Sequence, residues 1–134
     1  MISIFYRQGA DIVACHSETE FARLGKESVL WIDLLSPTGA EKKATEAFLG
    51  TEIQSRATAE EIESSSRFSE TGTAIFANTN FLSPSADEML EDAVSFTIVG
   101  GTLTTLRDIP LRSFDQLQRR LQARPEQFEN GWFL

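Results

Sequence analysis

Short apolar runs separated by glycine-containing turns open the chain. Residues 1–8 and 10–17 have the composition of two short strands on either side of Gly9, which predicts a hairpin. Residues 28–35, with the sequence SVLWIDLL, form a nearly continuous apolar run of strand length. Such a run is typical of a strand that is covered on both faces.

A helix is predicted over residues 39–49 from the residues at its two ends. Thr38 is a candidate N-cap, Glu41 stands three residues later as in a capping box, and Gly50 follows the last helical position. The strand at 28–35 and this helix form a β–α unit, which indicates a layered α/β domain. The stripe expected to face the core has residues three and four apart: Ala40, Ala44, Ala47 and Phe48.

Two further helices are predicted from spacing. Ser17 and Glu20 also have the spacing of a capping box, and Gly25 is expected to end the short helix that begins there. Residues 111–122 follow Pro110 and carry apolar side chains along one helical face: Leu111, Phe114, Leu117 and Leu121. The polar side of that helix carries Arg112, Arg119, Arg120 and Arg124.

Strands dominate the remaining part of the second half. Residues 67–72 and 73–82 are predicted strands joined at Gly72, whereas the polar stretch 83–92 is predicted to be a loop.

The clearest local signal is a pair of β-branched runs, VSFTIV and TLTTLR, around Gly100 and Gly101. It predicts a tight hairpin, because both central residues of such a turn need a positive φ. Antiparallel hairpins around one β–α unit predict an α/β (α+β) fold, an α/β/α sandwich whose mixed sheet is largely antiparallel.

The composition is that of one soluble globular domain spanning residues 1–134, with 41% hydrophobic and 24% charged residues. The formal net charge of −8 disfavours a nucleic-acid partner and suits attraction of cations. Cys15 is the only cysteine, so an internal disulfide is excluded and a reducing compartment is expected. No stretch approaches the roughly 20 apolar residues that cross a bilayer. The chain closes on the apolar sequence GWFL, and we expect the natural protein to continue beyond it.

Most catalytic signatures are absent from the sequence. His16 is the only histidine, which excludes a multi-histidine metal site. Cys15 and His16 are neighbours on a predicted strand, so they point to opposite faces and cannot act as a nucleophile–base pair. Asp33 is interpreted as a strand-end residue that ties down the loop before Thr38. We therefore do not expect an enzyme.

The stretch AEEIESSSRFSE at 59–70 has three glutamates within four positions, Glu60, Glu61 and Glu63. Carboxylates and serine hydroxyls are oxygen ligands, which suit a hard cation such as Mg²⁺. Thr58 and Glu61 also have the spacing of a helix cap, so capping and metal binding both remain open. A second acidic cluster is interpreted as a solvated loop: Asp87, Glu88, Glu91 and Asp92.

Several blocks taken together resemble the N-terminal domain of CorA-type magnesium transporters, most closely the proteobacterial branch. They are WIDL at 31–34, A-x-x-E-E-I-E-x-S-x-R-F at 57–68, and VSFTIVGGTLTTLRD at 94–108 followed by a helix that contains Phe114. The resemblance covers residues 28–121, and the order and spacing of the blocks match.

The resemblance implies a cytoplasmic α/β/α regulatory domain of a homopentameric channel for Mg²⁺, which also passes Co²⁺ and Ni²⁺. The full-length protein would lie in the bacterial inner membrane, with this domain on the cytoplasmic face. The chain contains neither the membrane spans nor the Gly-Met-Asn pore tripeptide that the resemblance implies. Membrane contact would come only through that C-terminal part.

The resemblance also implies a role for Glu60 and Glu61 as half of a regulatory Mg²⁺ site at the subunit interface. An aspartate of the neighbouring stalk would complete the site, so no tightly bound cofactor is expected in the isolated domain. This chain has Glu-Glu where the family commonly has Glu-Asp.

A stand-alone soluble binding domain without a membrane partner is the alternative. A longer reading frame with two apolar spans favours the transporter, and a stop codon favours the stand-alone domain. We expect the isolated domain to be monomeric or weakly associating.

Overall fold

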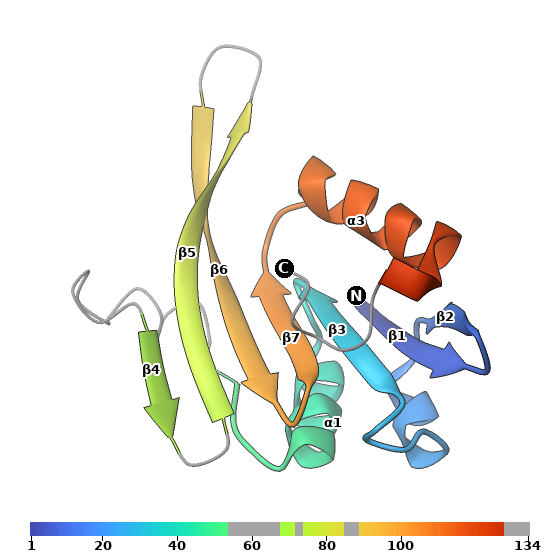
Figure 1. Cartoon of the computed structure of the whole chain (residues 1–134). Helices are drawn as coiled ribbons and strands as arrows, with labels where there is room; N and C mark the ends of the chain where they lie inside the picture. Colours follow the sequence, from blue (N-terminus) through green and yellow to red (C-terminus); the bar gives the residue numbers. More distant parts are fainter. Residues whose placement is uncertain (54–67, 72–73, 85–88, 128–134) are drawn as a thin grey trace.

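A seven-stranded mixed sheet organises the chain (Figure 1). The structure, a computed structural model, describes residues 1–53, 68–71, 74–84 and 89–127. The strand order is β2-β1-β3-β7-β6-β5-β4, and β3 and β7 are its one parallel pair within these ranges. The strands are β1 (Ile2–Gln8), β2 (Asp11–Cys15), β3 (Val29–Leu35), β4 (Phe68–Thr71), β5 (Ala74–Pro84), β6 (Met89–Val99) and β7 (Thr102–Arg107).

Helices cover both faces of the sheet, which confirms the α/β/α sandwich. The helix α3 (Arg112–Ala123) packs on one face, and the short 3₁₀ segment η3 (Pro125–Gln127) follows it. The helix α1 (Gly39–Leu49) and the 3₁₀ helix η1 (Glu18–Ala22) pack on the other face. The core therefore has two apolar layers, one between α3 and the sheet and one between α1, η1 and the sheet.

An irregularity in the pairing of β1 with β3 shapes the layer under α3. Phe5 pairs with Trp31 and Tyr6 pairs with Val29, so Leu30 is an extra residue without a partner on β1. Neighbouring residues of a regular strand point to opposite faces. Because of the extra residue, Leu30 and Trp31 both belong to the layer under α3, and the Trp31 ring stacks on Phe5 at 5.2 Å.

The predicted turns at Gly9 and at Gly100 and Gly101 are confirmed by their backbone angles, whereas Gly72 lies outside the described residues. Gly100 and Gly101 have φ values of 56° and 88°, and Gly9 between β1 and β2 has a φ of 65°. These are left-handed conformations that cost glycine little and other residues more.

The prediction of a loop over residues 83–92 is wrong for residues 83–84, which belong to β5, and for residues 89–92, which belong to β6; residues 85–88 lie outside the described part of the chain. The strands β5 and β6 pair along their whole length, from Ala74 with Val99 to Pro84 with Met89. Their ladder runs past the ends of their neighbours, because β4 pairs only up to Ala77 and β7 reaches no further than Ser95. Backbone pairing needs no apolar side chain, so a polar stretch can continue a strand when its partner lies beside it.

The capping of α1 is confirmed in both directions. The Glu41 backbone N–H donates to Thr38 Oγ1 at 3.2 Å, and the Thr38 N–H donates to Glu41 Oε1 at 2.9 Å. Gly50 ends the helix in the left-handed region with a φ of 76°. The N-terminal ammonium of Met1 lies 3.2 Å from Glu41 Oε1, which attaches this corner to the start of the chain.

The predicted core stripe of α1 is wrong by about one position. The buried residues are Thr45 and Leu49, Phe48 is half-buried, and Ala40 and Ala47 are exposed. Alanine side chains are small, so they provide too weak an apolar face to decide how a helix rotates against a sheet.

The short helix after β2 is a 3₁₀ helix that ends before Gly25. Ser17 caps it by accepting from the Thr19 N–H, and Glu20 pairs with Arg23 instead of reaching back to the cap. The spacing of Ser17 and Glu20 therefore predicts the start of the helix correctly. It predicts the wrong partner for Glu20, which pairs with Arg23 and not with the Ser17 backbone N–H.

We predict that Thr38→Ala lowers the free energy of unfolding by about 1 kcal/mol, because the substitution removes the acceptor for the Glu41 N–H. Chemical denaturation monitored by circular dichroism measures the change. Thr38→Ser keeps the hydroxyl and is the matched control. Equal losses in the two variants would assign the effect to the methyl group and not to the cap.

The pKa of Glu41 is lowered, chiefly by the hydrogen bond from the Thr38 backbone N–H and further by the Met1 ammonium. Its charged form therefore stabilises the fold above the pKa of the unfolded chain, and this contribution is lost as the pH falls through the folded value. We predict that the stability difference between the wild type and Glu41→Gln is largest near neutral pH and shrinks below about pH 5. A difference that stayed constant down to about pH 3 would contradict this assignment.

Candidate functional site

A buried ion pair joins the two parallel strands at the centre of the sheet. Arg107 Nε donates to Asp33 Oδ1 at 3.1 Å, and Arg107 Nη2 donates to Asp33 Oδ2 at 2.7 Å. The exposed fractions of the two side chains are 3% and 1%. Two parallel hydrogen bonds from a guanidinium to a carboxylate are the strongest form of this pair.

Further donors complete the environment of the Asp33 carboxylate. Thr105 Oγ1 donates to Oδ1 at 2.8 Å, and Gln118 Nε2, from α3, donates to Oδ2 at 3.0 Å. Trp31 Nε1 donates in turn to Thr105 Oγ1 at 3.0 Å. The hydrogen bonds to the carboxylate therefore come from β7 and from α3. The bond from Trp31 adds a second residue of β3 to the network.

The Arg107 guanidinium also fixes the path between β7 and α3. Its Nη1 donates to the Ile109 carbonyl at 3.0 Å, and its centre lies 4.7 Å from the ring centroid of Phe114. Such cation–π contacts are worth about 2 kcal/mol or more when water is excluded. The network thus determines where the first turn of α3 lies.

This arrangement is structural and not catalytic. The carboxylate oxygens of Asp33 accept four hydrogen bonds, which is about the full capacity of the group, so no lone pair remains for a metal ion or a substrate proton. The interpretation of Asp33 as a strand-end residue tying down the loop before Thr38 is wrong, because its partners are on β7 and α3.

The sequence prediction missed Arg107, Thr105 and Gln118. A signal was nevertheless present: Asp33 stands inside an apolar run, and Arg107, of opposite charge, ends a β-branched strand-forming run. Charged residues are rarely buried unless they are paired. A buried charge of each sign in two strand-forming runs therefore indicates a candidate ion pair.

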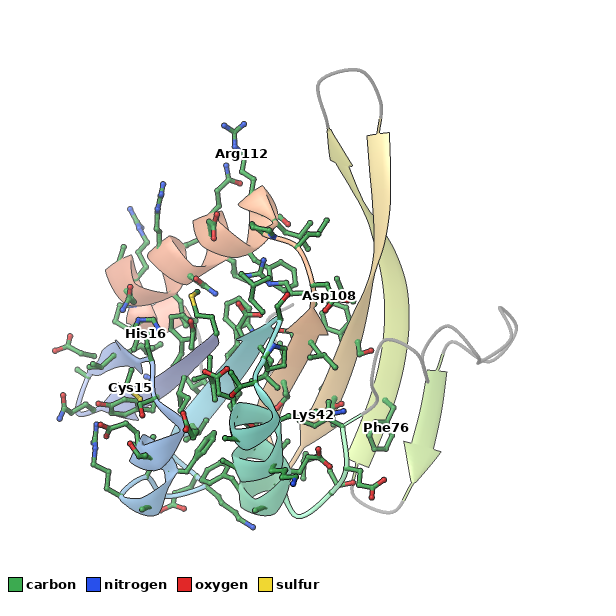
Figure 2. The ribbon with its side chains drawn as sticks, turned by 180° about the vertical axis from the view of Figure 1, so that it is seen from behind. Cys15, His16, Lys42, Phe76, Asp108 and Arg112 are labelled. Carbon is green, nitrogen blue, oxygen red and sulfur yellow. The ribbon has the colours of Figure 1, made fainter. Side chains whose placement is uncertain are left out.

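The predicted separation of Cys15 and His16 is confirmed. Cys15 packs against the apolar layer on the α1 side, whereas His16 Nδ1 lies 3.2 Å from Ser3 Oγ and 3.3 Å from the Ile2 carbonyl oxygen. Figure 2 shows both residues at the end of β2. Burial raises the pKa of the Cys15 thiol, and the Glu20 charge acts in the same direction, so the reactive thiolate is disfavoured.

The predicted polar side of the long helix is confirmed for four arginines. Figure 2 shows Arg112 pointing away from the sheet at the start of α3. The exposed members of this set are Arg112, Arg119, Arg120 and Arg124.

The predicted metal ligands Glu60 and Glu61 lie outside the described residues, as do Glu63, Asp87 and Glu88. Glu91 and Asp92 belong to β6 and not to a loop. Within the described part of the chain, no group of three or more histidine, cysteine, aspartate or glutamate side chains could hold a metal ion. The role of Glu60 and Glu61 as metal ligands therefore stays a prediction.

No helix among the described residues is long and apolar enough to cross a membrane. The chain matches no family model.

Known proteins of similar sequence are named as magnesium transport proteins. The chain is 34% identical over 110 residues to the magnesium transport protein CorA of Wolinella succinogenes, which covers 78% of this chain and 34% of that protein. It is 35% identical over 97 residues to the magnesium transport protein CorA of Haemophilus influenzae, which covers 72% of this chain and 31% of the relative. The chain spans about a third of the length of these relatives.

A solved structure shares the fold. The CorA magnesium transporter of Methanocaldococcus jannaschii superposes with a TM-score of 0.64 over 94% of this chain and 38% of its own, at 13% sequence identity. At this low identity the likeness concerns the architecture alone.

We predict that Asp33→Ala lowers the free energy of unfolding by about 3–5 kcal/mol, because it leaves the Arg107 charge buried without a partner. The double variant Asp33→Leu/Arg107→Met should lose less than the sum of the two single changes, since it removes both charges. Denaturant titration measures each variant.

The exposed pair of Glu20 and Arg23 supplies the control for this prediction. Glu20→Gln should change the free energy of unfolding by no more than about 1 kcal/mol. Additive losses for Asp33 and Arg107 would show that the two side chains do not act as one unit.

Proposed function

This chain is a domain of the CorA family, and from that membership we propose that it is the cytoplasmic regulatory domain of a divalent-cation transporter. The observation that carries the proposal is sequence identity of 34% and 35% to two CorA proteins over more than 70% of the chain. The shared architecture supports it. In this proposal the transported ion is Mg²⁺, with Co²⁺ and Ni²⁺ as further substrates.

The assembly in this proposal is a homopentamer in the bacterial inner membrane, with the domain on the cytoplasmic face. Its role is regulation and not catalysis, which fits a chain whose buried carboxylate Asp33 is fully hydrogen-bonded. A stand-alone soluble binding domain is not favoured, since the relatives described above are all named as transporters.

Glu60 and Glu61 are the proposed ligands of a regulatory Mg²⁺ ion. Their donor chemistry fits, because Mg²⁺ prefers carboxylate oxygens and usually takes only one or two of them from a protein. The segment 54–67 that contains them joins two anchored points, Ile53, which is 4% exposed in the layer under α1, and Phe68 at the start of β4. Because one end of the segment is attached to the apolar core and the other to the sheet, a movement of the acidic pair would be transmitted to the whole domain.

Electrostatic repulsion supplies the proposed switch. Carboxylates that face each other across a subunit boundary repel, and a bound Mg²⁺ ion cancels this repulsion and holds the neighbouring domains together. When cytosolic Mg²⁺ falls, the ion leaves and the domains separate. The net charge of −8 increases the bias toward separation in the absence of the ion.

We predict that Glu60→Gln/Glu61→Gln weakens Mg²⁺ binding to the full-length protein about ten-fold or more, because both charged ligands are lost. Isothermal titration calorimetry measures the affinity. Glu46→Gln/Glu52→Gln removes the same charge from α1 and the residues after it, and should leave the affinity within about two-fold. Equal affinities in the wild type and the Glu60/Glu61 variant would remove these two residues from the role.

Transport itself is tested separately with the complete gene. Its expression in a bacterial strain that lacks magnesium uptake should restore growth in low Mg²⁺. A reading frame without apolar spans, or a failure to restore growth by a correctly inserted protein, would contradict the transporter proposal.

A further inference from the structure

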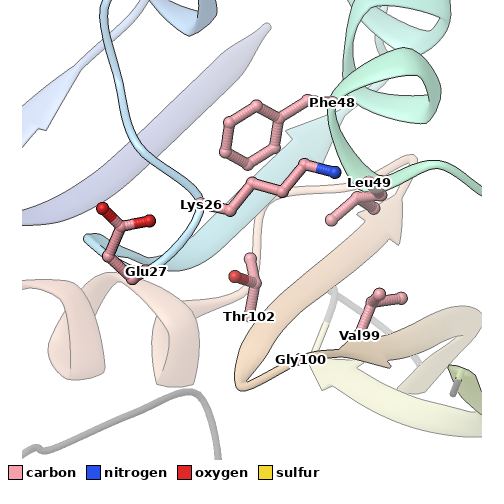
Figure 3. Close-up of a pocket in the computed structure, with 7 residues that line it drawn as sticks. All are labelled: Lys26, Glu27, Phe48, Leu49, Val99, Gly100 and Thr102. Atoms are coloured by element: carbon pink, nitrogen blue, oxygen red, sulfur yellow. The ribbon is translucent and has the colours of Figure 1, made fainter.

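A cavity of about 300 Å³ lies between the C-terminal end of α1, the turn between β6 and β7, and the segment that leads into β3 (Figure 3). Small-molecule sites in proteins begin at about this size and are mostly apolar with a few polar groups. The lining comes from three stretches far apart in the sequence and includes Lys26, Glu27, Phe48, Leu49, Val99 and Thr102.

Contacts behind the lining hold the walls of this cavity in place. The Phe48 ring stacks on Phe21 of η1 with centroids 4.6 Å apart. Thr102 Oγ1 donates to the Val29 carbonyl at 2.9 Å, so the orientation of its side chain, methyl group included, is fixed. A cavity formed before its ligand arrives loses little conformational entropy on binding.

Lys26 is the one cationic side chain among the described residues that line the cavity. Figure 3 shows the Lys26 side chain extending toward Leu49, with Phe48 and Thr102 on either side of it. The Glu27 carboxylate lies close to Gly25. A Cβ atom added to Gly25 would lie 2.7 Å from Glu27 Oε1. Lys26 and Glu27 therefore form no ion pair with each other, although they are neighbours in the chain.

We propose that this cavity binds a small amphiphilic organic anion. Its apolar part would contact Phe48, Leu49 and Val99, and its carboxylate would pair with the Lys26 ammonium. Apolar walls supply affinity for the body of such a ligand, and the Lys26 ammonium in the lining selects its charge. The proposal rests on the described lining residues alone, so its test is separate from that of the proposed cation sensor.

A purely structural role for Lys26 makes a different prediction. A cation beside the C-terminal end of α1 also stabilises the helix dipole. Loss of that role would lower the melting temperature of the chain without changing which ligand it prefers.

Paired titrations of the ¹⁵N-labelled chain distinguish the two roles. The probes are 4-phenylbutyrate and 4-phenylbutan-1-ol, which share an apolar body and differ in charge. Both should shift the amide signals of Leu49, Gly100 and Thr102, and the carboxylate should bind about five-fold more tightly. Lys26→Met should abolish this preference and Lys26→Arg should retain it.

Lys43→Met is the matched control, because Lys43 is an exposed lysine of α1 that does not line the cavity. It should leave the preference for the carboxylate unchanged. Three results would overturn the proposal: no saturable shifts at these amides, a preference that survives Lys26→Met, or an equal loss of preference in Lys43→Met.

Discussion

The buried ion pair of Asp33 and Arg107 is the constraint on which the arrangement of the other elements depends. A charge without a partner in this position would cost several kcal/mol, so β3 and β7 are stable beside each other only in the register that joins the two side chains. Moving β7 by one residue would direct Arg107 to the opposite face of the sheet. Because Gln118 and Phe114 contact the same pair, that register also determines the position of α3.

The two faces of the sheet are held by different kinds of interaction. The face under α3 combines apolar packing with the polar network of Trp31, Thr105 and the ion pair. The face under α1 is held by apolar contacts of Leu49 and Ile53. The chain leaves this second face toward residues 54–67, which contain the proposed regulatory pair. In the proposed function, the ion pair keeps the body of the domain rigid, so that cation binding at an interface moves the domain as one unit.

Local chemistry made several elements predictable. Gly100 and Gly101 adopt the positive φ that a tight turn requires, and Thr38 with Glu41 forms the capping box that the spacing indicates. The prediction was less accurate where the conformation of a segment depends on residues far away in the sequence. Residues 89–92, which include the acidic Glu91 and Asp92, extend β6 because β5 lies beside them. The buried side of α1 contains Thr45, which satisfies its hydroxyl by donating to the Glu41 carbonyl at 2.9 Å.

The sequence by itself determined the types of most elements, the positions of the glycine turns, the family, and the identity of the acidic pair proposed to bind Mg²⁺. It contained Asp33 and Arg107 but not their relationship, since 74 positions separate them along the chain. Only the tertiary structure made Asp33 a fully paired charge inside the core and brought three distant stretches together around the cavity beside α1. Turns and caps are set by interactions within a few residues, whereas the partners of a buried charge are set by strands and helices that meet only when the chain has folded.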